Sequence, residues 1–118
     1  MQQEKIRLIL KEAKLLIAQG WCQETMARDT NGNAVPSTSN SACEFCIAGA
    51  IHAAAYKHVN GQNFYESARP ARMAMRRAIG TVDLPMWNDW ESRTQSDVLH
   101  AITKAIALLD GFVESDGS

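Results

Sequence analysis

Three cysteines are the residues of this sequence best suited to chemistry, and they are Cys22, Cys43 and Cys46. Cys43 and Cys46 have the C-x-x-C spacing that occurs in redox centres and in metal sites. A zinc site needs four ligands, so His52 or His58 would have to join the three thiols. Because a second C-x-x-C pair and a βαβ pattern are both missing, we favour cysteines that act as small buried hydrophobic side chains. We therefore expect no metal and no cofactor.

A thiol hydrolase would need a base and an orienting group beside its cysteine. The residues that could take these roles are Cys43 or Cys46, His52 or His100, and Asn88 or Asp89. His52 lies six residues beyond Cys46 on one expected helix, too far for their side chains to meet. We expect His52 to be an interior residue bonded to a backbone group and His100 to lie on the surface. A thiol-dependent site, either metal-binding or hydrolytic, stays open as an alternative that uses Cys22, Cys43 and Cys46.

Tryptophans stand beside planar polar residues in two irregular segments of the chain. The first segment holds Trp21, Arg28 and Asp29, and the second holds Trp87, Asn88, Asp89, Trp90 and Arg93. Such groups suit recognition of a protein or a small polar ligand. The same residues could instead anchor loops, because Arg28 can bond Asp89 or loop carbonyls, and Asn88 or Asp89 can hold a turn. We favour this structural role over binding, since buried polar groups must be paired whatever the function. All of these residues except Trp90 form our candidate binding site.

Charge is distributed unevenly along the chain. Residues 57–80 carry five basic residues against Glu66 alone, whereas residues 81–118 carry seven acidic residues against two basic ones. The four arginines of the basic segment are Arg69, Arg72, Arg76 and Arg77. The first three would share one helical face if a helix continued through Pro70. Contact with nucleic acid is therefore a second alternative, although we favour a solvated face paired with the acidic last segment, because no helix-turn-helix signature is present.

Length and composition predict a single domain over residues 1–118. Apolar residues make up 46% of the chain and the formal net charge is −1, which is ordinary for a globular protein. No run of 18 apolar residues exists, so we expect no membrane-spanning helix. The first residues lack the features of a cleavable signal. We expect a cytoplasmic protein, and a homo-oligomer is compatible with these features.

The first third of the chain predicts a helix followed by a hairpin-like insertion between helices. Apolar residues recur at helical spacing over residues 3–19, and Gly20 supplies a stop. Residues 21–40 break this pattern and contain the pair Asn31-Gly32, which is typical of a hairpin turn. A two-stranded arm is not stable alone, so this hairpin must pack against the helices.

Helical patterns return in the middle of the chain. Residues 41–58 are rich in alanine, and Ser41 and Glu44 have the spacing of a capping box at the start of a helix. Residues 64–79 are also helical in pattern. We expect a break near Pro70, which leaves a short helix over residues 71–79.

The last part of the chain predicts a loop followed by a final helix. Residues 83–93 contain Pro85 and two tryptophans and predict a loop or short turn. Thr94 and Asp97 have capping spacing before an apolar stripe that runs from Val98 to Phe112. Residues 114–118 should fray. The prediction is a mainly α, compact domain of four to five helices with a small β-hairpin insertion.

Several short motifs together resemble a known family. In chain order these are Trp21-Cys22-Gln23, Ala27-Arg28-Asp29 with Asn31-Gly32, Phe45-Cys46 with Gly49-Ala50-Ile51, Trp87-Asn88-Asp89 with Arg93-Thr94, and Ala105-Ile106-Ala107. Over residues 6–109 the chain resembles a family of small bacterial and phage proteins known only as a domain of unknown function. The resemblance implies no activity. Its pattern lacks Cys43, which weakens the zinc interpretation, and it implies that Cys22 and Cys46 are partners in space, either packed or bonded.

The favoured function is that of a non-enzymatic binding or accessory protein. The resemblance adds an expected phage or mobile-element context. Any site would lie in the loops around Trp21, Arg28 and Asp29 and around Trp87, Asn88 and Asp89. The indoles would supply flat apolar contacts, and Arg28 and Asp89 would orient a polar partner or each other.

Overall fold

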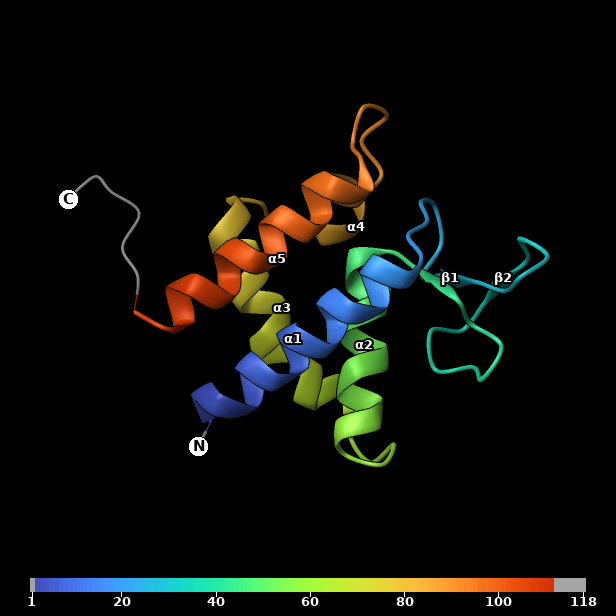
Figure 1. Cartoon of the computed structure of the whole chain (residues 1–118). Coiled ribbons are helices and arrows are strands. Elements are labelled where there is room, and N and C mark those ends of the chain that lie inside the picture. Colours follow the sequence, from blue (N-terminus) through green and yellow to red (C-terminus); the bar gives the residue numbers. More distant parts are fainter. Residues whose placement is uncertain (1, 112–118) are drawn as a thin grey trace.

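The computed structural model describes residues 2–111 of the chain. Five helices and three short strands follow one another, and Figure 1 shows the helices forming one body with the strands at its side. The helices are α1 (Gln2–Gln19), α2 (Ile47–His58), α3 (Phe64–Ile79), α4 (Leu84–Asn88) and α5 (Gln95–Leu109). The strands are β1 (Ala27–Arg28), β2 (Ala34–Val35) and β3 (Glu44–Phe45). The expected mainly α class is confirmed.

The core forms where α1, α2, α3 and α5 meet. Helix α1 packs against α2 and α5, and α3 packs against the same two helices. Ile9, Ile51 and Ile102 are almost completely buried, one on each of α1, α2 and α5. The many alanines of α2 let the neighbouring helices approach closely, because their side chains fill little space. No helix within residues 2–111 has the length and apolar character needed to cross a membrane.

The insertion forms a three-stranded antiparallel sheet in the order β2-β1-β3. Ala27 pairs with Val35 in the expected hairpin, whose turn contains Gly32 with a positive φ of 83°. We did not predict β3, which pairs on the other side of β1. The expected hairpin is therefore confirmed but incomplete, since β3 ties it to the start of α2.

Helix α2 begins later than predicted. The proposed start at Ser41 and its capping box with Glu44 are wrong, because Glu44 lies in β3. Backbone pairing prevails over the capping pattern: the Phe45 N–H donates to the Gly20 carbonyl, and the Cys46 N–H donates to the Met26 carbonyl. Cys46 then caps α2, and its sulfur accepts the Gly49 N–H at 3.2 Å.

Helix α3 runs through Pro70 without the predicted break. The proline removes one backbone donor from the helix, which normally disfavours such a position. Ala68, Ala71 and Met75 lie on both sides of Pro70 and are fully buried. Their packing keeps the helix continuous, so the short helix predicted over residues 71–79 is part of a longer one.

The last part of the chain agrees more closely with the prediction. The segment expected to be a loop or short turn contains the five-residue helix α4, capped by the Asp83 side chain. The capping box of Thr94 and Asp97 is present at the start of α5. The predicted fraying of residues 114–118, and Phe112 of the apolar stripe, lie outside the described residues.

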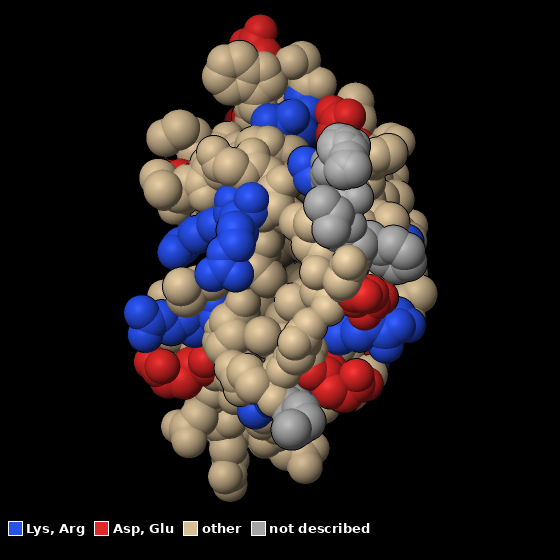
Figure 2. All heavy atoms as spheres, turned by 90° about the vertical axis from the view of Figure 1, so that its left-hand side faces the viewer, with Lys and Arg blue, Asp and Glu red and all other residues tan. Residues whose placement is uncertain are grey.

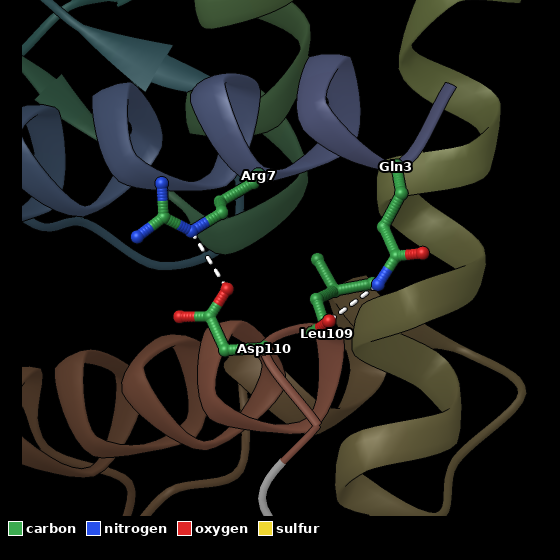
Figure 3. Close-up of polar contacts among 4 residues, drawn as sticks. All are labelled: Gln3, Arg7, Leu109 and Asp110. Carbon is green, nitrogen blue, oxygen red and sulfur yellow. Dashed lines mark hydrogen bonds and ion pairs between the residues drawn. The ribbon is translucent and has the colours of Figure 1, made fainter. Parts of the chain in front are cut away.

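The two ends of the helical body are joined. Figure 3 shows the first turns of α1 beside the end of α5. The Arg7 Nε donates to Asp110 Oδ1 at 2.7 Å, and the Gln3 side chain donates to the Leu109 carbonyl. The helices that begin and end the fold are therefore held together by side chains as well as by the core.

Candidate functional site

The Asn88 side chain joins the two tryptophan-bearing segments. Asn88 is completely buried at the end of α4. Its Oδ1 accepts the Trp21 Nε1–H and the Ile47 N–H, each at 2.9 Å. Its Nδ2 donates to the Cys22 carbonyl at 3.1 Å and to Asp89 Oδ1 at 3.0 Å. These four bonds use the full capacity of an amide side chain, so Asn88 holds the segments together rather than facing a ligand.

A second set of bonds surrounds this junction. The Gln23 side chain donates to the carbonyls of Asn88 and Trp90, at 3.1 and 3.0 Å. Asp89 Oδ1 accepts the Glu24 N–H at 2.9 Å. Glu24 has a positive φ of 73°, a backbone conformation that side chains disfavour. The bond to Asp89 helps to hold that conformation, so Asp89 fixes the turn that follows Trp21.

Arg28 and Asp29 stabilise the hairpin and the segment before it. Arg28 donates from Nη1 to the Gly32 carbonyl and from Nη2 to the Gln23 carbonyl, at 3.0 and 3.1 Å. The predicted contact with loop carbonyls is confirmed, and the alternative contact with Asp89 does not form. Asp29 Oδ1 accepts the N–H groups of Asn31 and Asn33, both at 2.9 Å. Both candidate residues therefore stabilise local backbone.

Arg93 and Trp87 form a stacked pair. The guanidinium carbon of Arg93 lies 3.8 Å from the centre of a Trp87 ring, within the range of a cation–π contact. Its Nε also donates to the Trp87 carbonyl at 2.8 Å. Arg93 therefore closes the loop that leaves α4. All buried side-chain nitrogen and oxygen atoms within residues 2–111 have hydrogen-bond partners.

The exposed large side chains beside the Asn88 junction are not among the predicted site residues. Met86, Asp89, Trp90, Glu91 and Ser92 line a surface hollow, which we call the Trp90 surface. Trp90 is 61% exposed and Met86 is 67% exposed. Both were absent from the predicted site, although the position of Trp90 directly after Asp89 in a tryptophan-rich segment was a usable signal. The predicted residues thus position the backbone that carries this surface.

Cys22 and Cys46 lie near the junction in surroundings that disfavour the thiolate. All three are free thiols, and Cys22 and Cys46 are buried. Burial raises the pKa of Cys22 to about 11, and the nearby Cys46 adds to the increase. Burial also raises the pKa of Cys46. The Cys22 N–H donates to the carbonyl of Phe45, which precedes Cys46, so these two residues are neighbours that pack without a disulfide bond.

No histidine is hydrogen-bonded to a thiol within residues 2–111. His52 is buried as expected, but it bonds the Arg72 side chain rather than a backbone group, with 3.1 Å between His52 Nε2 and Arg72 Nη1. Burial lowers the pKa of His52 to about 4, and the positive charge of Arg72 contributes. His100 is exposed, as predicted. In the part of the chain from residue 2 to residue 111, no three His, Cys, Asp or Glu residues are grouped to hold a metal ion.

Comparisons with known proteins identify one related family. The model of a family described as "Family of unknown function (DUF6197)" matches residues 1–108. No curated protein and no solved structure matches the chain.

Proposed function

The chain belongs to DUF6197, a family of unknown function, and because that membership assigns no activity, we propose from the site geometry that it is a non-enzymatic binding protein. Its Trp90 surface would contact a protein partner. The observation that carries this proposal is an exposed tryptophan on a fixed backbone, beside a junction whose buried polar groups are all paired.

The backbone under the indole supports this proposal. The Trp90 carbonyl accepts bonds from the Gln23 side chain and from the Arg93 N–H, at 3.0 and 2.9 Å. A segment whose backbone is already fixed loses less backbone conformational entropy on binding. Tryptophans are enriched among the residues that dominate the energy of protein interfaces. We therefore expect Trp90 to be the central contact and Met86 to extend it.

The charges at the hollow indicate the chemistry of the partner. Asp89 and Glu91 line it together with Met86 and Trp90. A complementary partner would present an apolar group flanked by lysine or arginine. The buried and protonated thiols of Cys22 and Cys46 favour this proposal over the thiol-dependent alternative. A cytoplasmic location and an association with phages or mobile elements stay predictions.

Photo-crosslinking from single positions tests the proposal. A photoreactive phenylalanine analogue replaces Trp90 in one protein and Leu15 in a control, because Leu15 lies on α1 and is 59% exposed. Both proteins are irradiated in cells that naturally express the chain. We expect one partner to be captured from position 90 and not from position 15.

The captured partner is then purified and its affinity is measured by calorimetry. Trp90→Ala should raise Kd at least tenfold, as expected for a dominant interface residue, whereas Leu15→Ala should change Kd by less than twofold. Equal capture from both positions, or an unchanged Kd for Trp90→Ala, would contradict the proposal.

A further inference from the structure

A row of arginines lies on the outer side of α3. Arg69 and Arg76 are exposed, and Arg72 between them is partly buried. Because α3 continues through Pro70, these residues follow one another at helical spacing on one face. Figure 2 shows the molecule from the left-hand side of Figure 1, and Lys and Arg side chains gather at the left of that view, where α3 lies.

The arginine row is not neutralised by the acidic last segment. Arg69, Arg72, Arg76 and Arg77 form no ion pair with a carboxylate of residues 2–111. Asp110 of the acidic segment pairs instead with Arg7 of α1. The favoured interpretation from the sequence, a solvated face paired with the acidic segment, therefore lacks its ion pairs within the described part of the chain.

Arg72 is held in a fixed orientation. Its Nη1 contacts His52 Nε2 at 3.1 Å and donates to the Tyr65 carbonyl at 3.2 Å. The guanidinium carbon also lies 4.4 Å from the centre of the Tyr65 ring. His52 is neutral at pH 7, because burial lowers its pKa to about 4, and a neutral imidazole nitrogen can accept a bond from arginine.

The other edge of this guanidinium has no partner within residues 2–111. Nε and Nη2 of Arg72 make no hydrogen bond to the described residues. These two nitrogens form the side of the guanidinium fork that binds two oxygens of a phosphate. Burial lowers the pKa of Arg72, the charges of Arg76 and Arg69 add to the decrease, and Tyr65 and Glu66 oppose it. The three cations therefore repel one another, and a bound anion would relieve this repulsion.

We propose that the arginine row of α3 binds the phosphate backbone of a nucleic acid, with Arg72 as the oriented contact and Arg69 and Arg76 on either side. Intervals of three and four residues place the attachment points about 4.5 and 6 Å apart along the helix axis. A nucleic-acid strand offers a comparable row of charges, with a phosphate roughly every 3.4 Å of axis in duplex DNA. The row thus suits a linear polyanion better than a single phosphate group.

Fluorescence anisotropy of the full chain tests the proposal with labelled 20-nucleotide single-stranded DNA, the same sequence as RNA, and a 20-base-pair duplex. Measurements are made at about 20 and 200 mM salt. The variant Arg69→Gln/Arg76→Gln removes two charges from exposed side chains of α3, and Lys11→Gln/Lys14→Gln removes two from α1. Circular dichroism confirms that both variants fold.

We expect at least one of the three nucleic acids to bind at low salt. The α3 variant should weaken its affinity at least tenfold and reduce the slope of log K against log salt by about 1.4 to 1.8, the value for two lost contacts. The α1 variant should change affinity less than threefold. Arg72→Lys, which retains charge but loses the fork, should also weaken binding several-fold.

Three outcomes would overturn the proposal. The first is no binding of any of the three nucleic acids at low salt. The second is an equal loss of affinity in the α1 variant, which would indicate attraction to the molecule as a whole. The third is binding to phosphatidylserine vesicles without binding to nucleic acid, which would assign the face to an anionic membrane.

Discussion

At the scale of single residues, Asn88 decides how the two tryptophan-bearing segments meet. An asparagine beside two tryptophans suits either a ligand contact or a structural bond, and the need to pair buried polar groups favours the structural bond. The structure places Asn88 out of contact with solvent, with four internal partners. The sequence favoured a structural role for this residue but could not identify its partners, because Trp21 lies 67 positions away.

Replacing Asn88 with alanine should destabilise the fold strongly. The variant leaves the Ile47 N–H, the Trp21 indole N–H and the Cys22 carbonyl without a partner, and each such group costs about 1–3 kcal/mol when buried. We expect a loss of roughly 3 kcal/mol or more in the free energy of unfolding, measured by urea titration. The exposed Asn31→Ala control should change it by less than about 0.5 kcal/mol. A small loss in Asn88→Ala would mean that water replaces these bonds.

His52 gives the protein a defined response to acid. Its pKa is about 4 in the folded chain, lowered by burial and by Arg72, against 6.5 for the unperturbed side chain. Between these values the unfolded chain takes up a proton that the folded chain does not, so stability falls as pH decreases from 6.5 to 4. The charged group facing the imidazole is Arg72, and the Phe64 and Tyr65 rings lie beside it.

A His52→Gln variant isolates this contribution. Glutamine keeps an acceptor for Arg72 but does not titrate. Between pH 7 and pH 4 the wild type should lose on the order of 3 kcal/mol more than the variant, as measured by urea unfolding at each pH. The carboxylates are the same in both proteins. Identical profiles of unfolding free energy against pH would therefore show that His52 is not the source of the acid sensitivity.

At the scale of elements, close approach of backbones sets where α2 begins and where the insertion packs. A Cβ atom added to Gly49 would lie 2.0 Å from the Met26 carbonyl oxygen. The same oxygen accepts the Cys46 N–H at the start of α2. Gly49 is therefore required for the close contact between α2 and the insertion, although glycine disfavours a helix.

Gly49→Ala separates the effect of packing from that of helix propensity. Propensity alone predicts a gain of about 1 kcal/mol, since alanine favours helices. Overlap with Met26 predicts a loss of roughly 2 kcal/mol or more. We expect a lower Tm in a thermal melt followed by circular dichroism. An unchanged or higher Tm would show that the insertion can move away from α2 without cost.

Pro70 and Ser41 explain why two element boundaries were wrongly predicted. Both residues carry strong local signals, one against a helix and one for a helix start. At Pro70 the buried face of α3 continues on both sides, and at Ser41 the following residues pair with β1. Local signals fail at these positions because tertiary contacts contribute more free energy than one capping bond or one lost hydrogen bond.

At the scale of the whole molecule, charge is separated between surfaces. The net charge is only −1, yet the arginines of α3 gather on one side while Asp89 and Glu91 border the Trp90 surface. Each surface therefore attracts a partner of opposite charge without the molecule being basic or acidic overall. The proposed protein contact and the proposed nucleic-acid contact use different residues, so variants at one surface test it separately from the other.

Sequence patterns alone predict the helical class, the amphipathic stripes of the first and last helices, the hairpin turn at Asn31-Gly32 and the capping box of Thr94. These features depend on side-chain spacing within a few turns of chain, which a sequence contains directly. The folded chain was needed to show that Asn88 bonds two distant segments, that Trp90 is the exposed tryptophan and that Arg72 is oriented by His52. Those outcomes depend on which distant segments lie together, and this is set by packing of the whole core rather than by local propensity.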